Sequence, residues 1–438
     1  MASQKSVVSE IFRILERNFL IRWFVFFLLI LFVWRIRFRF VFEKVYAEDG
    51  ALFLADTYRF NFPWDILEPA AGYSTLIMRI GGRFVSLFPL QYASIFFALF
   101  SALCLSFLAA GIFNYNNLGN NHKSSKLVLA LCFMFLPITS FSAIGNIANL
   151  YVYFMTASAV MLYHKEISRF QVLYKSLVLA LAALSLPLSF FLVPILFHRS
   201  YLARKSEEIW RFQRSDFVFL VALLVQFVFI LANTLGDRKP HAPQSVIKVV
   251  YLYLDRGIGS SVIPRFGFVS TNGDSTDFEN SFLLFNSLAS RVLTVLGFLL
   301  FVIIIFIRNQ KLNYSKIRPQ FWFLISLGFI YSLTVGLFFN PEPRYMAFPA
   351  FITCWGAIML AGVHNSHATR RVFNFYLILV LVLGLSSSDH RSLGPTWNSE
   401  LQKAKRICLD QTLNYEIKLR TLPIDRIWEM VLKCRNLN

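Results

Sequence analysis

The feature that most constrains this chain is a series of apolar segments, each close to the length that crosses a lipid bilayer. A membrane-spanning helix needs about 20 consecutive, mostly apolar residues. Segments of this kind recur along most of the sequence, at about 19–36, 88–113, 127–143, 148–163, 176–197, 216–234, 292–307, 321–339, 345–362 and 372–387. We therefore expect an all-α polytopic membrane protein with about 9–11 transmembrane helices.

The composition of the chain supports this class of protein. Hydrophobic residues make up 56% of the chain and charged residues only 15%, with a mean hydropathy of +0.56. A soluble globular protein is about one quarter charged, so this chain has too few charges to cover a water-exposed surface. The run 19–36 is longer than the apolar core of a signal peptide, and no small-residue cleavage site follows it. We expect it to be a retained transmembrane helix.

The net charge of +19 does not indicate nucleic-acid binding. Lys and Arg cluster in the loops between apolar runs, where they orient a membrane protein and contact lipid headgroups. The sequence contains no basic soluble module with interleaved aromatic residues. Membrane lipids, and no nucleic acid, are therefore the expected partners of these charges.

The distribution of the basic loops predicts an unusual path for the run 176–197. All the short basic loops can face the cytoplasm only if this run enters and leaves the membrane on the same side. Pro187, in the middle of Ser185–Ser189, and Pro194 each remove a backbone donor and break a helix. We expect two half-helices that meet near the opposite face. The alternative is a single kinked spanning helix.

This topology divides the chain into a transmembrane domain, 1–388, and a short extracytoplasmic tail, 389–438. The outer-face loops of the domain include 38–87 and 235–291, and we expect them to carry short amphipathic helices. Cys408 and Cys434 lie in the tail, where a periplasm permits oxidation. We predict a disulfide between them; two free thiols are the alternative.

Adjacent carboxylates in the first outer loop are the clearest candidates for catalysis. Glu48 and Asp49 follow the first membrane helix in the segment Tyr46–Gly50. A carboxylate at the membrane boundary can take the proton of a hydroxyl, and a second acid beside it can tune the first or hold a metal. We assign Asp49 as the base and Glu48 as its support, and expect Asp49→Asn to fold. The alternative is a solvated surface turn. The sequence fixes no cofactor; a divalent metal, Mg²⁺ or Mn²⁺, is the candidate for this acid pair.

A second group of residues could bind a phosphate and a sugar. Arg344 follows a Pro-rich turn at a membrane boundary, where a guanidinium can neutralise a phosphate leaving group. Arg79 and Tyr345 are predicted to assist it; the alternative for Arg344 is contact with lipid headgroups. The predicted substrate-binding residues come from three outer segments and are Tyr73, Asn146, Asn149 and Arg256.

These motifs together resemble the GT-C superfamily of integral membrane glycosyltransferases. The run Glu342–Pro349 is similar to the Arg-Tyr-x-x-x-Pro segment of bacterial members that use polyprenyl-phosphate sugars. Many members carry Asp first in the acidic pair; here Glu48 precedes Asp49, which leaves open which residue corresponds to the catalytic carboxylate. The resemblance implies an inverting transfer from a polyprenyl-phosphate sugar donor to a surface glycan or lipid-linked glycan acceptor. It also implies a multi-pass protein of a bacterial inner membrane, with its active site facing the periplasm or exterior.

Two other functions remain open at this point. An O-antigen-type polymerase also handles polyprenyl-linked glycans, but would carry its main charged residues in two later outer loops. A transporter or flippase of lipid-linked glycans would show paired repeats, broken helices in matching positions and charges near the membrane midplane. In this sequence the charges gather at one interface, and no second half matches the first. The sugar, the acceptor and the linkage do not follow from the sequence.

Overall fold

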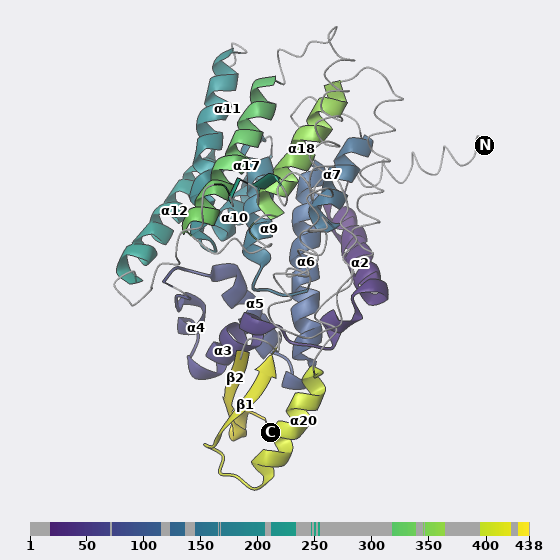
Figure 1. Ribbon diagram of the computed structural model, residues 1–438, viewed down its shortest axis with the longest axis vertical. Coiled ribbons are helices and arrows are strands. Elements are labelled where there is room, and N and C mark those ends of the chain that lie inside the picture. Colours follow the sequence, from purple (N-terminus) through teal and green to yellow (C-terminus); the bar gives the residue numbers. More distant parts are fainter. Residues whose placement is uncertain are drawn as a thin grey trace, which may run out of the picture.

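A computed structural model describes residues 18–70, 72–114, 123–135, 145–164, 166, 168–205, 212–233, 247, 249–250, 253–254, 318–338, 345, 347–363, 395–421 and 428–437. Figure 1 shows a bundle of helices with a small C-terminal module at one end. Four helices among these residues are long and apolar enough to cross a membrane: Phe19–Ile36, Leu90–Asn114, Arg214–Asn233 and Pro319–Leu337. This is compatible with the membrane protein that the sequence predicts.

The bundle is built around α9 (Leu150–Leu162), in which all 13 side chains are buried. The long helices α2 (Phe19–Arg37) and α6 (Ala93–Asn114) pack along each other, and α6 also contacts α9 and α7 (Lys123–Phe135). On the other side, α17 (Arg318–Phe338) pairs with α18 (Ala347–Val363), which reaches α7 and α9. With 13 and 17 residues, α9 and α18 are shorter than the predicted runs 148–163 and 345–362.

The predicted hairpin at 176–197 corresponds to α10 (Arg169–Ala183), the 3-10 helix η4 (Pro187–Leu192) and α11 (Val193–Lys205). At the turn, Leu184 and Ser185 accept hydrogen bonds from the amides of Leu76 and Ile77. At the other end, Lys175 of α10 and Arg199 of α11 both face Asp216, in the first turn of α12 (Arg214–Asn233). The chain therefore turns back at Pro187, although its first leg is a 15-residue helix and not a short half-helix.

The first predicted outer loop, 38–87, contains a series of short helices. It contains η1 (Arg39–Phe42), the π-helix η2 (Asp49–Leu54), α3 (Ala55–Arg59), α4 (Trp64–Leu67) and α5 (Leu76–Ser86), and η3 (Leu90–Tyr92) follows it. Two glycines let α5 pack closely on its neighbours. A Cβ on Gly82 would lie 2.5 Å from the carbonyl oxygen of Phe53, and one on Gly81 would lie 3.0 Å from Ile147. This close packing places α5 directly against η2 and the turn before α9.

The C-terminal module corrects the expectation of a purely helical chain with a simple tail. It consists of α20 (Trp397–Leu409), an antiparallel hairpin of β1 (Glu416–Thr421) and β2 (Trp428–Lys433), and the short helix η9 (Cys434–Asn436). The strand pairs Ile417–Leu432 and Leu419–Met430 face the buried side. Alternation of apolar and polar residues with period 2 is the signal for such a strand. Two strands of six residues give only a weak signal beside long apolar runs.

Several predicted segments cannot be compared with the structure. The runs 292–307 and 372–387, and nearly all of the loop 235–291, lie outside the described residues.

Candidate functional site

The central feature of the site is a contact between two segments nearly one hundred residues apart. We call Tyr46–Gly50 the acidic turn and Gly145–Asn149 the Asn146 turn. Asp49 Oδ1 accepts a hydrogen bond from the Ala148 amide at 2.8 Å, and Oδ2 accepts one from the Ile147 amide at 3.1 Å. Because α9 starts at Leu150, the Asp49 carboxylate lies just before the N-terminus of a helix, where negative charge is favourable. The structure thus joins two segments that the sequence predicted separately.

The two acids of the pair have different surroundings. Asp49 is 1% exposed, whereas the neighbouring Glu48 is only partly buried. A base must be reached by the hydroxyl from which it takes a proton. Asp49 therefore holds a turn in place, and Glu48 is the more exposed of the two acids. Which of the two acts as a base stays a prediction.

The Asn146 turn is fixed by its own side chain and by a glycine. The Asn146 side chain accepts a hydrogen bond from the Asn149 amide at 3.2 Å, and both residues are buried. Gly145 has a φ of +69°, and a Cβ at this position would overlap Val41. Glycine is therefore required here, because other residues disfavour this φ and have no space. Asn146 and Asn149, predicted to bind substrate, build the turn that contacts Asp49.

Arg79 is paired within the first outer loop. Its Nη1 donates to Asp56 Oδ2 at 2.5 Å, and the guanidinium carbon lies 5.5 Å from the centre of the Phe53 ring. Arg79 is 1% exposed, and its Nε and Nη2 have no hydrogen-bond partner among the residues that the structure describes. One turn further along α5, Arg83 lies 3.7 Å from Asp65. The predicted phosphate contact of Arg79 would therefore compete with an acidic partner, Asp56, that sequence reasoning did not assign.

Tyr345 lies beside the start of α9. Its ring centre is 6.3 Å from that of Tyr151, the second residue of α9. Since the Asn146 turn leads directly into α9, this contact brings Tyr345 to the same end of the bundle as the acidic turn. Arg344, the residue before Tyr345, lies outside the described residues, as does Arg256.

Tyr73 lies three residues before the start of α5. It forms a short antiparallel bridge with Ala70, through mutual backbone hydrogen bonds of 3.0 and 3.3 Å. The next residue, Ser74, exchanges two hydrogen bonds of 3.2 Å with the Gln226 side chain of α12. Tyr73 is thus fixed at the N-terminal end of α5, on the side that faces α12.

The C-terminal module covers the acidic turn. The structure joins Cys408 and Cys434 in a disulfide with a Cα–Cα distance of 5.5 Å. The amide of Trp397 donates to the Glu43 carbonyl at 2.8 Å, and its indole donates to the Leu90 carbonyl at 2.7 Å. Sequence reasoning missed these docking contacts, because a backbone carbonyl has no signature in the sequence.

A buried charge network at the opposite end of the bundle was also missed. Lys175 and Asp216 are fully buried, and Arg199 pairs with Asp216 and donates to the Leu162 carbonyl at 2.5 Å. Burial and the nearby Lys175 ammonium lower the pKa of His164 to about 4, so this ring is neutral near pH 7. The signal was Asp216 itself, an acid at the start of an apolar run. The network joins the last residue of α9 and the first turn of α12 to the middle of α10 and α11.

No metal site emerges from these groups. Among the described residues, no group of three or more His, Cys, Asp or Glu side chains could hold a metal ion. Both oxygens of Asp49 already accept amide hydrogens, which reduces their capacity as metal ligands.

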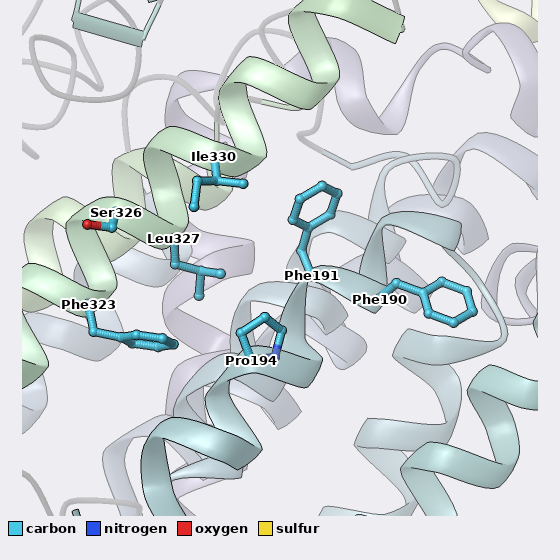
Figure 2. Close-up of a pocket in the computed structure, with 7 residues that line it drawn as sticks. All are labelled: Phe190, Phe191, Pro194, Phe323, Ser326, Leu327 and Ile330. Atoms are coloured by element: carbon cyan, nitrogen blue, oxygen red, sulfur yellow. The ribbon is translucent and has the colours of Figure 1, made fainter. Parts of the chain in front are cut away.

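An apolar cavity of about 380 Å³ lies beside the break at Pro187. Figure 2 shows Phe191 and Pro194 across from residues of α17, with Phe190 beside them and its ring turned away. The residues lining the α17 side are Phe323, Ser326, Leu327 and Ile330. Among the described residues that line the cavity, Ser326 is the one polar side chain, so the cavity suits a hydrocarbon chain.

Comparison with known proteins does not assign the chain to a family. No family model matches the sequence, and neither a curated protein nor a solved structure matches it.

Proposed function

We propose that this chain is a membrane glycosyltransferase that moves a sugar, with inversion, from a polyprenyl-phosphate carrier to a surface glycan or lipid-linked glycan. The reaction would take place on the outer face of a bacterial inner membrane. The observation that carries the proposal is the contact of Asp49 with the Ile147 and Ala148 amides, which builds one site from two predicted segments at one end of the bundle. Four potential membrane-spanning helices support a membrane-bound substrate.

In this proposal Glu48 and Asp49 have different roles. Glu48 takes the proton of the acceptor hydroxyl while the hydroxyl oxygen attacks the anomeric carbon of the donor sugar. The bond between that carbon and the phosphate oxygen breaks, and the phosphate leaves with the electron pair. Asp49 holds the acidic turn against the Asn146 turn, so that Glu48 is presented in a fixed position. The partial exposure of Glu48 and the burial of Asp49 support this division.

The leaving phosphate needs positive charge, and the proposal keeps Arg344 in that role. A guanidinium can contact two phosphate oxygens at once and stabilise the negative charge as it develops. The contact between Tyr345 and Tyr151 supports a location of this segment near the acidic turn. Arg79 would contribute through its Nε and Nη2 atoms, which have no hydrogen-bond partner in the described part of the chain, while Asp56 neutralises its charge.

One observation favours a second candidate, a transporter or flippase of lipid-linked glycans. The helix pair α10 and α11 is interrupted by η4, and discontinuous helices are typical of transporters. The apolar cavity beside this break would suit the lipid chain in either function.

An assay with the purified protein in detergent separates the two candidates. We expect transfer of a labelled sugar from its polyprenyl-phosphate carrier to an acceptor, because transfer does not need two separate membrane sides. A flippase would leave the labelled donor unchanged in detergent and move it only in sealed vesicles. Movement in vesicles without transfer in detergent would exclude the transferase.

A further inference from the structure

Thr421, the last residue of β1, contacts the chain on both sides of the acid pair. Its hydroxyl donates to the carbonyl of Ala47 at 3.3 Å, and its side chain is buried. Its methyl group faces Gly50, where a Cβ would lie 2.7 Å from Thr421 Cγ2. Ala47 immediately precedes Glu48, and Gly50 immediately follows Asp49. One side chain of the C-terminal module therefore bridges the residues that flank the two carboxylates.

The backbone between these contacts has an unfavourable conformation. Ala47 has a φ of +22°, outside the regions that residues with a Cβ normally occupy. Such a conformation persists only when surrounding contacts hold it. The Thr421 hydroxyl on the Ala47 carbonyl is one of these contacts, and the hydrogen bonds of Asp49 to the Asn146 turn are another.

The module that carries Thr421 is itself attached at several points. The Trp397 amide bonds the Glu43 carbonyl, three residues before Tyr46, and its side chain is buried against η3. The Cys408–Cys434 disulfide connects the end of α20 to the start of η9, directly after β2. Because β1 pairs with β2 along its full length, Thr421 is held in a braced hairpin.

We infer that Thr421 is a positioning residue that sets the orientation of Glu48. Its hydroxyl fixes the Ala47 carbonyl, and its methyl group occupies the space that a side chain at position 50 would need. The inference deepens the proposed function and rests on it for its effect on catalysis. It assigns the C-terminal module a role at the site: the hairpin acts as a support for the acidic turn and makes no contact with reacting atoms itself.

The test uses two substitutions that separate the hydroxyl from the methyl group. Thr421→Val keeps the shape and removes the donor, while Thr421→Ser keeps the donor. We expect Thr421→Val to lower kcat about five-fold or more, the factor that the loss of one average hydrogen bond gives. The KM for the donor should stay unchanged, and Thr421→Ser should retain most of the activity. Thr412→Val, at an exposed position of the same module, is the matched control and should behave like the wild type.

A labelling measurement tests the same inference without any assay of transfer. A cysteine introduced by Glu48→Cys is partly exposed, and its rate of reaction with a membrane-impermeant maleimide depends on how firmly the acidic turn is held. Adding Thr421→Val should raise this rate about five-fold, while buried Cys132 stays unlabelled and so reports an intact fold. Equal labelling rates with and without Thr421→Val would overturn the inference, as would a Thr421→Ser variant with the defect of Thr421→Val. If the wild type transfers no sugar, the proposed function fails, and the labelling rates still decide the role of Thr421.

Discussion

At the scale of single residues, the acid pair shows how neighbours in sequence can differ in role. Glu48 and Asp49 share charge and position, yet only Asp49 is buried with an amide hydrogen on each oxygen. The sequence predicted a catalytic role for the pair, because adjacent carboxylates after a membrane helix suit proton transfer. The sequence could not show which of the two acids is buried, since the amides that donate hydrogen bonds to Asp49 lie 98 and 99 residues away.

The geometry of Asp49 changes the expected effect of Asp49→Asn. An amide side chain has one acceptor oxygen and one NH₂ group, so one of the two backbone amides would face a donor. We expect the free energy of unfolding to fall by about 1–3 kcal/mol, the cost of a buried group left without its partner. Thermal unfolding of the purified protein measures this effect. A midpoint equal to that of the wild type would contradict the structural role of Asp49.

At the scale of elements, the close packing of α5 depends on the absence of a side chain at Gly82. A Cβ there would lie 2.5 Å from a backbone oxygen of Phe53, which cannot move without distorting η2. We expect Gly82→Ala to destabilise the protein by about 1–3 kcal/mol. In Gly328→Ala, the matched control in α17, the new Cβ would meet Pro349 at an ordinary 3.5 Å. The control should be neutral or stabilising, because Ala favours a helix over Gly. Equal unfolding midpoints for the two variants would contradict this account of α5.

The hairpin of α10 and α11 is fastened by Asp216, whose carboxylate faces Lys175 and Arg199. Asp216→Asn would leave the buried cations Lys175 and Arg199 with less negative charge to neutralise them. Removing one partner of a buried ion pair costs about 3–5 kcal/mol. We expect a loss of this order in unfolding experiments and a reduced yield of folded protein. Asp410→Asn, at an exposed position in the C-terminal module, serves as the control. Similar stability of the two variants would show that the network does not fasten the hairpin.

At the scale of the whole molecule, the apolar runs predicted most of the helical framework. The prediction 19–36 corresponds to α2 at Phe19–Arg37, and 216–234 corresponds to α12 at Arg214–Asn233. Long apolar runs allow a helix to be predicted from the local sequence alone, because each run must be buried in lipid or protein along its whole length. The C-terminal hairpin and the docking of Thr421 on Ala47 were not predicted, because they depend on contacts between distant segments. The same reason explains why the pairing of Arg79 with Asp56 was not foreseen.

The predicted topology of the whole chain depends on the hairpin of α10 and α11. Because α10 and α11 return to one end of the bundle, the predicted topology places the N-terminus in the cytoplasm and the C-terminus outside. We expect a C-terminal reporter that fluoresces only in the cytoplasm to stay dark, and a reporter active only outside to work. Strong cytoplasmic fluorescence would place the C-terminal module, and with it the acidic turn, on the wrong side for the proposed reaction.

The most direct test of the whole account is the rate of sugar transfer by Glu48→Gln from a purified polyprenyl-phosphate donor. The substitution keeps the size of the side chain and removes its basicity, at a partly exposed position where the fold should tolerate it. The matched control is Glu43→Gln, in the same loop, which replaces a carboxylate paired with Arg39 on the surface. At equal amounts of folded protein, we predict that Glu48→Gln lowers transfer by about 10²–10⁴-fold, the usual contribution of a general base, and that Glu43→Gln does not. Wild-type transfer by Glu48→Gln would contradict the assignment of Glu48 as the base.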